Sequence, residues 1–168
     1  TFVSYSHNLR LLLSQVNQNR RFARLSGLQT AVLLDTLSAS NQTIIVDLGT
    51  DLNEISRAAL ERADQIIVCL RPERIALSAA RYLLNSLKDG LFPLTELHAL
   101  MIDFGPQGTQ LPRTAVESFL GHPLLATISI LPAEMTRAVN KAQPLVHLSA
   151  QTQSGNYLRQ LAQQLVKT

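Results

Sequence analysis

The sequence has few cysteines, aromatic residues and charges. Of its 168 residues one is cysteine, none is tryptophan and 16% are charged. The single cysteine, Cys69, excludes an internal disulfide framework and a cysteine-rich zinc site, and its apolar neighbours predict a small buried core residue. Because charges are few and 46% of the residues are hydrophobic, the composition excludes a disordered chain and predicts one folded core.

Long apolar runs and targeting signals are also missing. No apolar stretch approaches the ~18 residues that a membrane-spanning helix needs, and no basic segment followed by an apolar one opens the chain. We therefore expect a cytoplasmic location without stable membrane insertion. We also expect residues 1–168 to form a single domain, and their start inside a polar stretch at Thr1 fits a fragment of a longer chain.

Short apolar runs alternate with segments of helical spacing. The runs have the length of strands and cover residues 9–16, 43–47, 65–70, 97–103 and 124–131. The runs at 43–47 and 65–70 are apolar almost throughout and rich in β-branched residues, which is typical of parallel strands covered on both faces. Because a helical segment follows each run, we predict an α/β fold: a doubly wound, mainly parallel sheet with helices on both faces.

Residues typical of helix starts and ends support the predicted helices. Asp51 and Glu54 form a pair that resembles a capping box, and Pro72 suits a first helical position. Gly121 suits a helix end, because glycine tolerates the left-handed conformation that often terminates helices.

Residues that follow parallel strands are the candidates for a ligand site, because ligands bind outside the carboxyl ends of such strands. These positions are Asp47, Arg71, Asp103 and Pro132. Asp47 ends an apolar run and precedes Gly49, which is a Walker-B-like arrangement. An acidic side chain there can orient a water on a nucleotide-bound Mg²⁺, and the glycine lets the backbone approach a γ-phosphate. The alternative at all four positions is ordinary turn chemistry.

Longer motifs resemble the ParA/MinD ATPases, and their order along the chain carries the resemblance. Residues 60–78 are similar to a strand–helix unit of that family, with Ala63-Asp64 before the strand and Pro72-Glu73 after it. Residues 131–145 are similar to the family's closing motif, which begins with Pro132 and ends with Pro144. Residues 113–123 resemble a helix of the pilus-assembly branch that contains CpaE and TadZ. The resemblance covers nearly the whole chain.

The resemblance implies a P-loop NTPase-like fold and a dimerising ATPase that positions cargo, or assembles a pilus or secretion machine, with protein partners. It implies that Asp47 is catalytic and holds Mg²⁺ through a water. It also implies that Gly49 and Asp103 lie near ATP, and that the backbone of Pro132, Ala133 and Glu134 lines the base.

One part of that family's machinery does not occur in the sequence. The family's phosphate loop, which is rich in glycine and lysine, neutralises the triphosphate, and no such motif is present in the 168 residues. We therefore expect ATP and Mg²⁺ binding, and ATPase activity, only where an upstream segment supplies the loop. The alternative is a degenerate module that keeps the fold for interaction and does not hydrolyse nucleotide.

The predicted helices in the last third of the chain raise two further classes of partner, nucleic acid and a membrane. A nucleic-acid interface would use Arg113, Arg137, Lys141 and Arg159. We prefer a solvated helix surface, because no aromatic residues interleave with these charges. The last helix, residues 157–166, has leucines opposite glutamines, so we expect it to pack on the sheet and not to bind a membrane, which requires a basic polar face.

Overall fold

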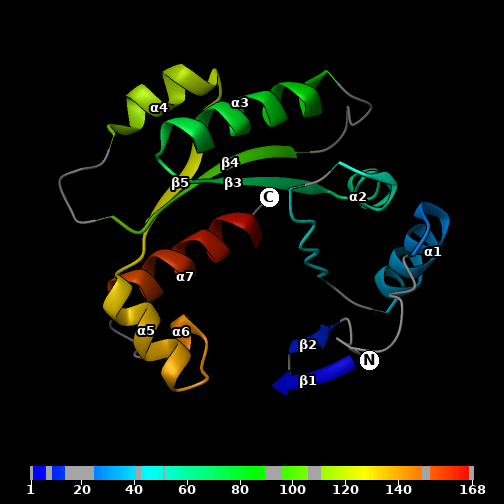
Figure 1. Cartoon of the computed structure of the whole chain (residues 1–168). Coiled ribbons are helices and arrows are strands. Elements are labelled where there is room, and N and C mark those ends of the chain that lie inside the picture. Colours follow the sequence, from blue (N-terminus) through cyan, green and yellow to red (C-terminus); the bar gives the residue numbers. More distant parts are fainter. Residues whose placement is uncertain are drawn as a thin grey trace, which may run out of the picture. The chain divides into compact units, whose positions relative to one another are not determined.

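The computed structural model describes residues 2–6, 9–13, 25–40, 43–50, 52–89, 96–105, 111–148 and 152–166. The chain divides into two compact units, Thr1–Ala59 and Leu60–Thr168. Figure 1 shows the elements in chain order. The prediction of a single domain over the whole chain stays a prediction.

A parallel sheet forms the centre of the second unit. Its order is β3–β4–β5, with β3 at Gln65–Leu70, β4 at Glu96–Asp103 and β5 at Leu124–Ser129. These strands match the predicted runs at 65–70, 97–103 and 124–131 to within two residues at each end. The predicted α/β fold with a mainly parallel sheet is therefore confirmed.

Helices cover both faces of this sheet (Figure 1). On one face, α3 (Arg74–Lys88) contacts β3, and α4 (Arg113–Leu120) contacts both α3 and β5. On the other face, α7 (Gln153–Val166) contacts β5. The short α6 (Leu145–Leu148) connects α7 with α5 (Pro132–Asn140) through contacts on each side.

The face of α3 that is turned to the sheet is a single apolar stripe. Its buried residues are Leu77, Ala80, Leu84 and Leu87. Their spacing of three and four residues places them on one side of a helix. Burial of each leucine side chain contributes about 1.5–3 kcal/mol, so this stripe attaches α3 to the sheet.

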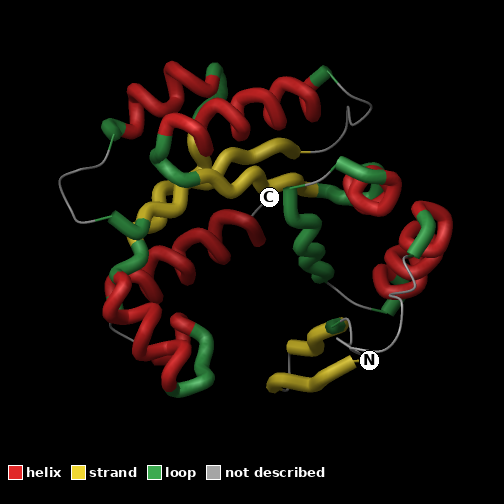
Figure 2. Tube along the Cα trace, in the orientation of Figure 1, coloured by secondary structure: helices red, strands yellow, loops and turns green. Residues whose placement is uncertain are grey.

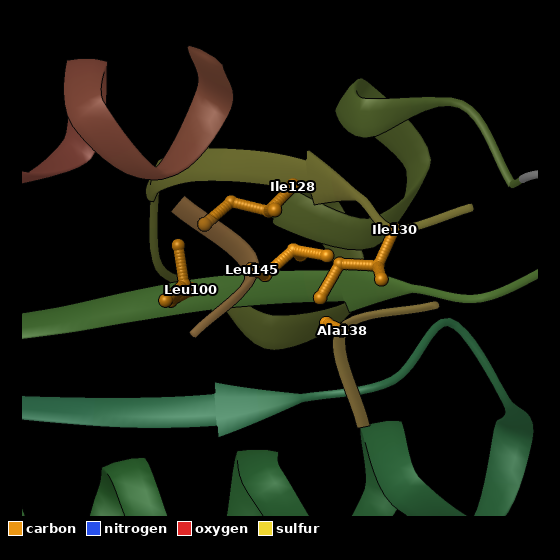
Figure 3. Packing of buried hydrophobic residues seen from close by; sticks show 5 residues of the cluster. All are labelled: Leu100, Ile128, Ile130, Ala138 and Leu145. Atoms are coloured by element: carbon orange, nitrogen blue, oxygen red, sulfur yellow. The ribbon is translucent and has the colours of Figure 1, made fainter. Parts of the chain in front are cut away.

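The opposite face carries a second apolar cluster, drawn in Figure 3. Its buried members are Leu100, Ile128, Ile130, Ala138 and Leu145. Leu158 and Leu161 of α7 pack against this cluster. The expectation that the last helix packs on the sheet is therefore confirmed, and the helix begins at Gln153, before the predicted start at Tyr157.

The helix boundaries follow the predicted signals in part. Gly121 ends α4 with a φ of 63°, the left-handed conformation predicted for it. Pro72 lies two residues before α3 begins at Arg74, so the prediction of a first helical position is wrong. Its ring still suits the extended backbone that leads into the helix.

The first unit contains a hairpin and helices. β1 (Phe2–Ser6) pairs with β2 (Leu9–Leu12) in antiparallel orientation. Of the predicted run at 9–16, Leu9–Leu12 forms a strand of this hairpin and not of the parallel sheet, and residues 14–16 lie outside the described residues. Helix α1 (Gly27–Ser38) begins with a capping box in which Ser26 and Gln29 bond reciprocally.

Helix α2 (Glu54–Leu60) ends at the boundary of the two units. Asp51, its predicted cap, lies outside the described residues. Asn53 caps the helix, since its Oδ1 accepts the N–H groups of Ile55 at 2.9 Å and Ser56 at 3.1 Å.

The predicted buried strand at residues 43–47 is wrong. Residues 43–48 form a loop (Figure 2), and the side chain of Ile45 is 92% exposed. A β-strand requires a hydrogen-bonded neighbour, and among the described residues of the first unit the only strand pair is β1 with β2. A β-branched composition predicts which segments suit a strand, but it does not supply the neighbour.

Cys69 also departs from its prediction, because it is exposed and not part of the core. Residues alternate between the faces of a strand, and in β3 the buried positions are Ile66, Val68 and Leu70. Cys69 lies on the other face near the end of the strand. Its apolar neighbours in the sequence therefore do not report its own burial.

Candidate functional site

The carboxyl ends of the three parallel strands share one edge of the sheet. Parallel pairing places Leu70 opposite Met101 and Asp103 opposite Ser129. The backbone N–H of Ile130 donates to the carbonyl of Asp103 at 2.8 Å. This bond holds the segment that follows β5 directly against the end of β4, and it brings Asp103 beside the predicted base-lining turn.

Asp103 is a buried carboxylate at the end of β4. The residue is 4% exposed, and its Oδ1 accepts the backbone N–H of Gly105 at 2.7 Å. Its Oδ2 is buried and has no hydrogen-bond partner. A buried acceptor without a donor is costly, so this oxygen fits a ligand that brings an N–H group, such as the amine of a nucleobase.

An aromatic–cation pair lies at the same edge of the sheet. The Arg71 guanidinium lies 5.6 Å from the centroid of the Phe104 ring, and its Nη2 forms an ion pair with Glu73 at 2.7 Å. Both side chains of the ion pair are more than half exposed, so the pair contributes little to stability. Phe104 directly follows Asp103 in the chain, so the pair brings the Arg71 cation from the end of β3 to the residue next to Asp103.

The turn after β5 exposes some of the predicted residues and buries one. Pro132 is the first residue of α5, and both Pro132 and Ala133 are exposed. Glu134 is 6% exposed, and its Oε2 accepts the backbone N–H of Ser154 at 3.3 Å. The Glu134 carboxylate is therefore engaged with the start of α7, while Pro132 and Ala133 are exposed residues of this turn.

Asp47 and Gly49 lie in the first unit and form a local turn. Asp47 is exposed, and its Oδ1 accepts the backbone N–H of Gly49 at 3.1 Å. Gly49 has a φ of 66°, which explains the glycine, because residues with a side chain rarely adopt this conformation. Asp47 thus ends a loop and not a buried strand. Its role toward Mg²⁺ stays a prediction.

The structure also limits which groups fit a metal ion. Within the described ranges, no three or more His, Cys, Asp and Glu side chains come together in a group that could hold a metal. One exposed carboxylate that already accepts a backbone N–H fits the predicted contact through water better than direct ligation, because Mg²⁺ takes protein ligands sparingly and keeps several waters.

Ser154 and Thr152 are functional candidates that the sequence reasoning missed. The Ser154 Oγ accepts the backbone N–H of Leu131 at 3.1 Å, and the Thr152 Oγ1 accepts that of Gly155 at 3.2 Å. A signal was present, since serine and threonine before a helical segment are the residues that cap helix starts. The contact of Ser154 with the turn after β5 has no local signal, because it joins residues 23 positions apart.

Two of the four cations predicted for a nucleic-acid interface, Arg113 and Arg159, make contacts within the chain. Arg113 donates to the Glu117 carboxylate and to the carbonyl of Leu124. Arg159 donates to the carbonyl of Val146 at 2.8 Å. These arginines hold elements together, which weakens the nucleic-acid alternative.

Comparison with known proteins identifies the fold through solved structures. No protein-family model and no curated protein sequence matches the chain. The ParA family ATPase from Chlorobium tepidum matches with a TM-score of 0.87 at 18% sequence identity, over 98% of this chain and 66% of that one. The chain has the ParA/MinD fold.

Two archaeal structures agree with the ParA/MinD fold. The cell division ATPase MinD of Pyrococcus furiosus matches with a TM-score of 0.70 at 17% identity, over 84% of this chain and 59% of that one. The septum site-determining protein MinD of Pyrococcus horikoshii, solved with Mg-ADP, matches with a TM-score of 0.69 at 16% identity, over 83% and 56%. The chain therefore spans about three fifths of the length of these proteins.

In the described part of the chain, no helix combines the length and apolarity needed to cross a membrane. The candidate site lies at the carboxyl edge of the sheet, where Asp103 is bonded to the turn after β5.

Proposed function

We propose that this chain belongs to a ParA/MinD-like protein for spatial positioning or for assembly of a pilus or secretion machine. Nucleotide binding requires that an upstream segment supply the phosphate loop. The observation that carries the proposal is the buried Oδ2 of Asp103, an acceptor without a donor. Asp103 ends β4, and its backbone carbonyl accepts the N–H of Ile130 in the segment after β5.

Each candidate residue has a distinct role in this proposal. Asp103 accepts an N–H group of the base, and the backbone of the exposed residues Pro132 and Ala133 lines the base. Asp47 orients a water on the nucleotide-bound Mg²⁺, and Gly49 lets the backbone approach the terminal phosphate. Bound Mg²⁺ would help to neutralise the phosphate charge, and positioning together with charge stabilisation supplies almost all of the catalysis in phosphoryl transfer.

The proposed branch rests on one segment of the sequence. Residues 113–123 resemble the CpaE and TadZ proteins, which supports pilus assembly over DNA partition or septum placement. We propose a cytoplasmic homodimer that acts on a protein partner. Light scattering of the intact protein with and without Mg-ATP tests the dimer, and an unchanged monomer mass would contradict it.

The decisive experiment measures the melting temperature of the intact protein with saturating Mg-ATP. A ligand at about 100 times its Kd adds ~2.7 kcal/mol, which corresponds to a rise of about 5–10 °C for a chain of this size. The variant Asp103→Ala should lose much of this rise, and the control variant Asp89→Ala, in an exposed residue at the end of α3, should keep it.

The second candidate function is a degenerate interaction module with the same fold. The Glu134 carboxylate supports it, because that group bonds to α7 and is not directed to a ligand. The same melting experiment separates the two functions. If Mg-ATP at saturation leaves the melting temperature of the intact protein unchanged, the nucleotide proposal is rejected and the interaction module stands.

A further inference from the structure

We infer that Ser154 and Glu134 are positioning residues for the base-lining turn, so that helix α7 takes part in nucleotide binding. This inference rests on the proposed function of that turn. It concerns residues that touch no nucleotide themselves and act through the backbone of residues 131–134.

The evidence is a reciprocal pair of hydrogen bonds between two helix starts. The Ser154 Oγ accepts the N–H of Leu131, the residue before α5, at 3.1 Å. In return, the Glu134 carboxylate in the first turn of α5 accepts the N–H of Ser154 at 3.3 Å. The first N–H groups of a helix have no partner within the helix, and here each of these helices supplies the acceptor that the other one lacks.

Both side chains are buried, which makes this arrangement hard to rearrange. Ser154 is 0% exposed and Glu134 is 6% exposed. A buried carboxylate requires compensation, and the positive end of the α7 dipole supplies part of it. Loss of either partner would leave a buried polar group unsatisfied, so the two helix starts hold each other in one geometry.

Consecutive backbone groups attach the turn on two sides. The N–H of Ile130 is bonded to the carbonyl of Asp103 on β4, and the N–H of Leu131 is bonded to Ser154 on α7. The next residues, Pro132 and Ala133, are exposed. The position of the base-lining backbone relative to Asp103 is thus set by β4 on one side and by α7 on the other.

Helix α7 is itself held by the core. Leu158 and Leu161 pack against the apolar cluster around Ile128. A displacement of α7 would therefore carry Ser154 away from Leu131 and loosen the turn. A rigid turn loses less entropy when a ligand binds, so an intact contact should appear as tighter nucleotide binding.

The test compares Ser154→Ala with Ser154→Thr in the intact protein. We measure the Kd of Mg-ATP by calorimetry well below the melting temperature, together with hydrogen exchange at the Leu131 amide. Ser154→Ala should raise the Kd about three- to tenfold, the loss expected for one buried hydrogen bond, and should speed exchange at Leu131. Ser154→Thr, which keeps the hydroxyl, should restore most of the affinity. Ser78→Ala removes an exposed hydroxyl on α3 and serves as the control.

The outcomes separate the inference from the proposed function. If the wild type binds Mg-ATP and Ser154→Ala binds it equally well, with only a lower melting temperature, Ser154 is merely structural and the inference is overturned while the proposed function stands. If the wild-type protein does not bind Mg-ATP, both are overturned.

Discussion

Glu117 accepts the backbone N–H of Leu124 at 2.9 Å, and so it binds the first residue of β5 from helix α4. Arg113 lies one turn earlier on α4, pairs with the same carboxylate at 2.9 Å and donates to the carbonyl of Leu124. Both backbone groups of Leu124 are thus held by one ion pair. This arrangement ties the first five residues of α4 to the start of the next strand.

These contacts predict how Glu117 affects stability as a function of pH. The Leu124 N–H and Arg113 lower the pKa of Glu117 below its ordinary value of 4.5. A carboxylate whose folded pKa is lowered contributes its stabilisation above the unfolded pKa and loses it as the pH falls through the folded pKa. Glu117→Ala should therefore lower the melting temperature at pH 7, and the difference from wild type should shrink below pH ~4. Glu61→Ala, in an exposed residue, should give no such difference at either pH.

A second pH-dependent prediction concerns His122 at the amino end of the sheet. Its Nε2 lies 3.1 Å from the carbonyl of Leu97. Burial, followed by the charge of Lys88, lowers the pKa of His122 below its ordinary value of 6.5, although the bond to Leu97 acts in the opposite direction. The unfolded chain therefore binds this proton more readily than the folded chain.

The sign of this effect follows directly. The contribution of neutral His122 to the free energy of unfolding is fully present above pH ~6.5. It declines as the pH falls from there toward the lower folded pKa of His122. His122→Gln keeps an N–H donor without this titration, so its melting temperature should change less between pH 7.5 and 5.5 than that of the wild type. His147→Gln, in an exposed residue, should retain the wild-type slope. An unchanged slope in His122→Gln would contradict the prediction.

The start of α7 provides a steric prediction. A Cβ added at Gly155 would lie 2.6 Å from the Thr152 Oγ1, which is closer than real Cβ contacts. Gly155→Ala should destabilise the protein by about 1–3 kcal/mol, the usual cost of overpacking, as measured by urea unfolding. Thr152→Ala removes the clashing oxygen, so the double variant should lose less stability than the sum of the single variants. Strict additivity would show that the clash is not the cause.

The sequence allowed most of the second unit to be predicted, because its strands and helices carry local signals. The run at 65–70 is both apolar and β-branched, and it forms β3 as expected. The run at 43–47 has the same composition and forms a loop. The difference between them is a paired neighbour, and composition cannot report whether a neighbour exists.

The candidate site was predictable to a similar extent. Asp103 ends β4 and Pro132 comes shortly after β5, and their positions at one edge of the sheet follow from parallel topology. The buried state of Glu134 was not predictable, because an acidic residue in the first turn of a helix is usually exposed and stabilises that same helix. Here its carboxylate bonds to Ser154, twenty residues later, in the first turn of α7.

The parallel register of the second unit has a consequence for how the protein folds. Gln65 and Glu96 stand opposite each other in β3 and β4 and are separated by 31 residues. The strands can meet only after the intervening chain, including α3, has closed into a long loop, and closing such a loop costs entropy before any pairing offsets it. We therefore expect refolding of this unit to be slower than that of a helical bundle of equal length, with strand pairing as the late event.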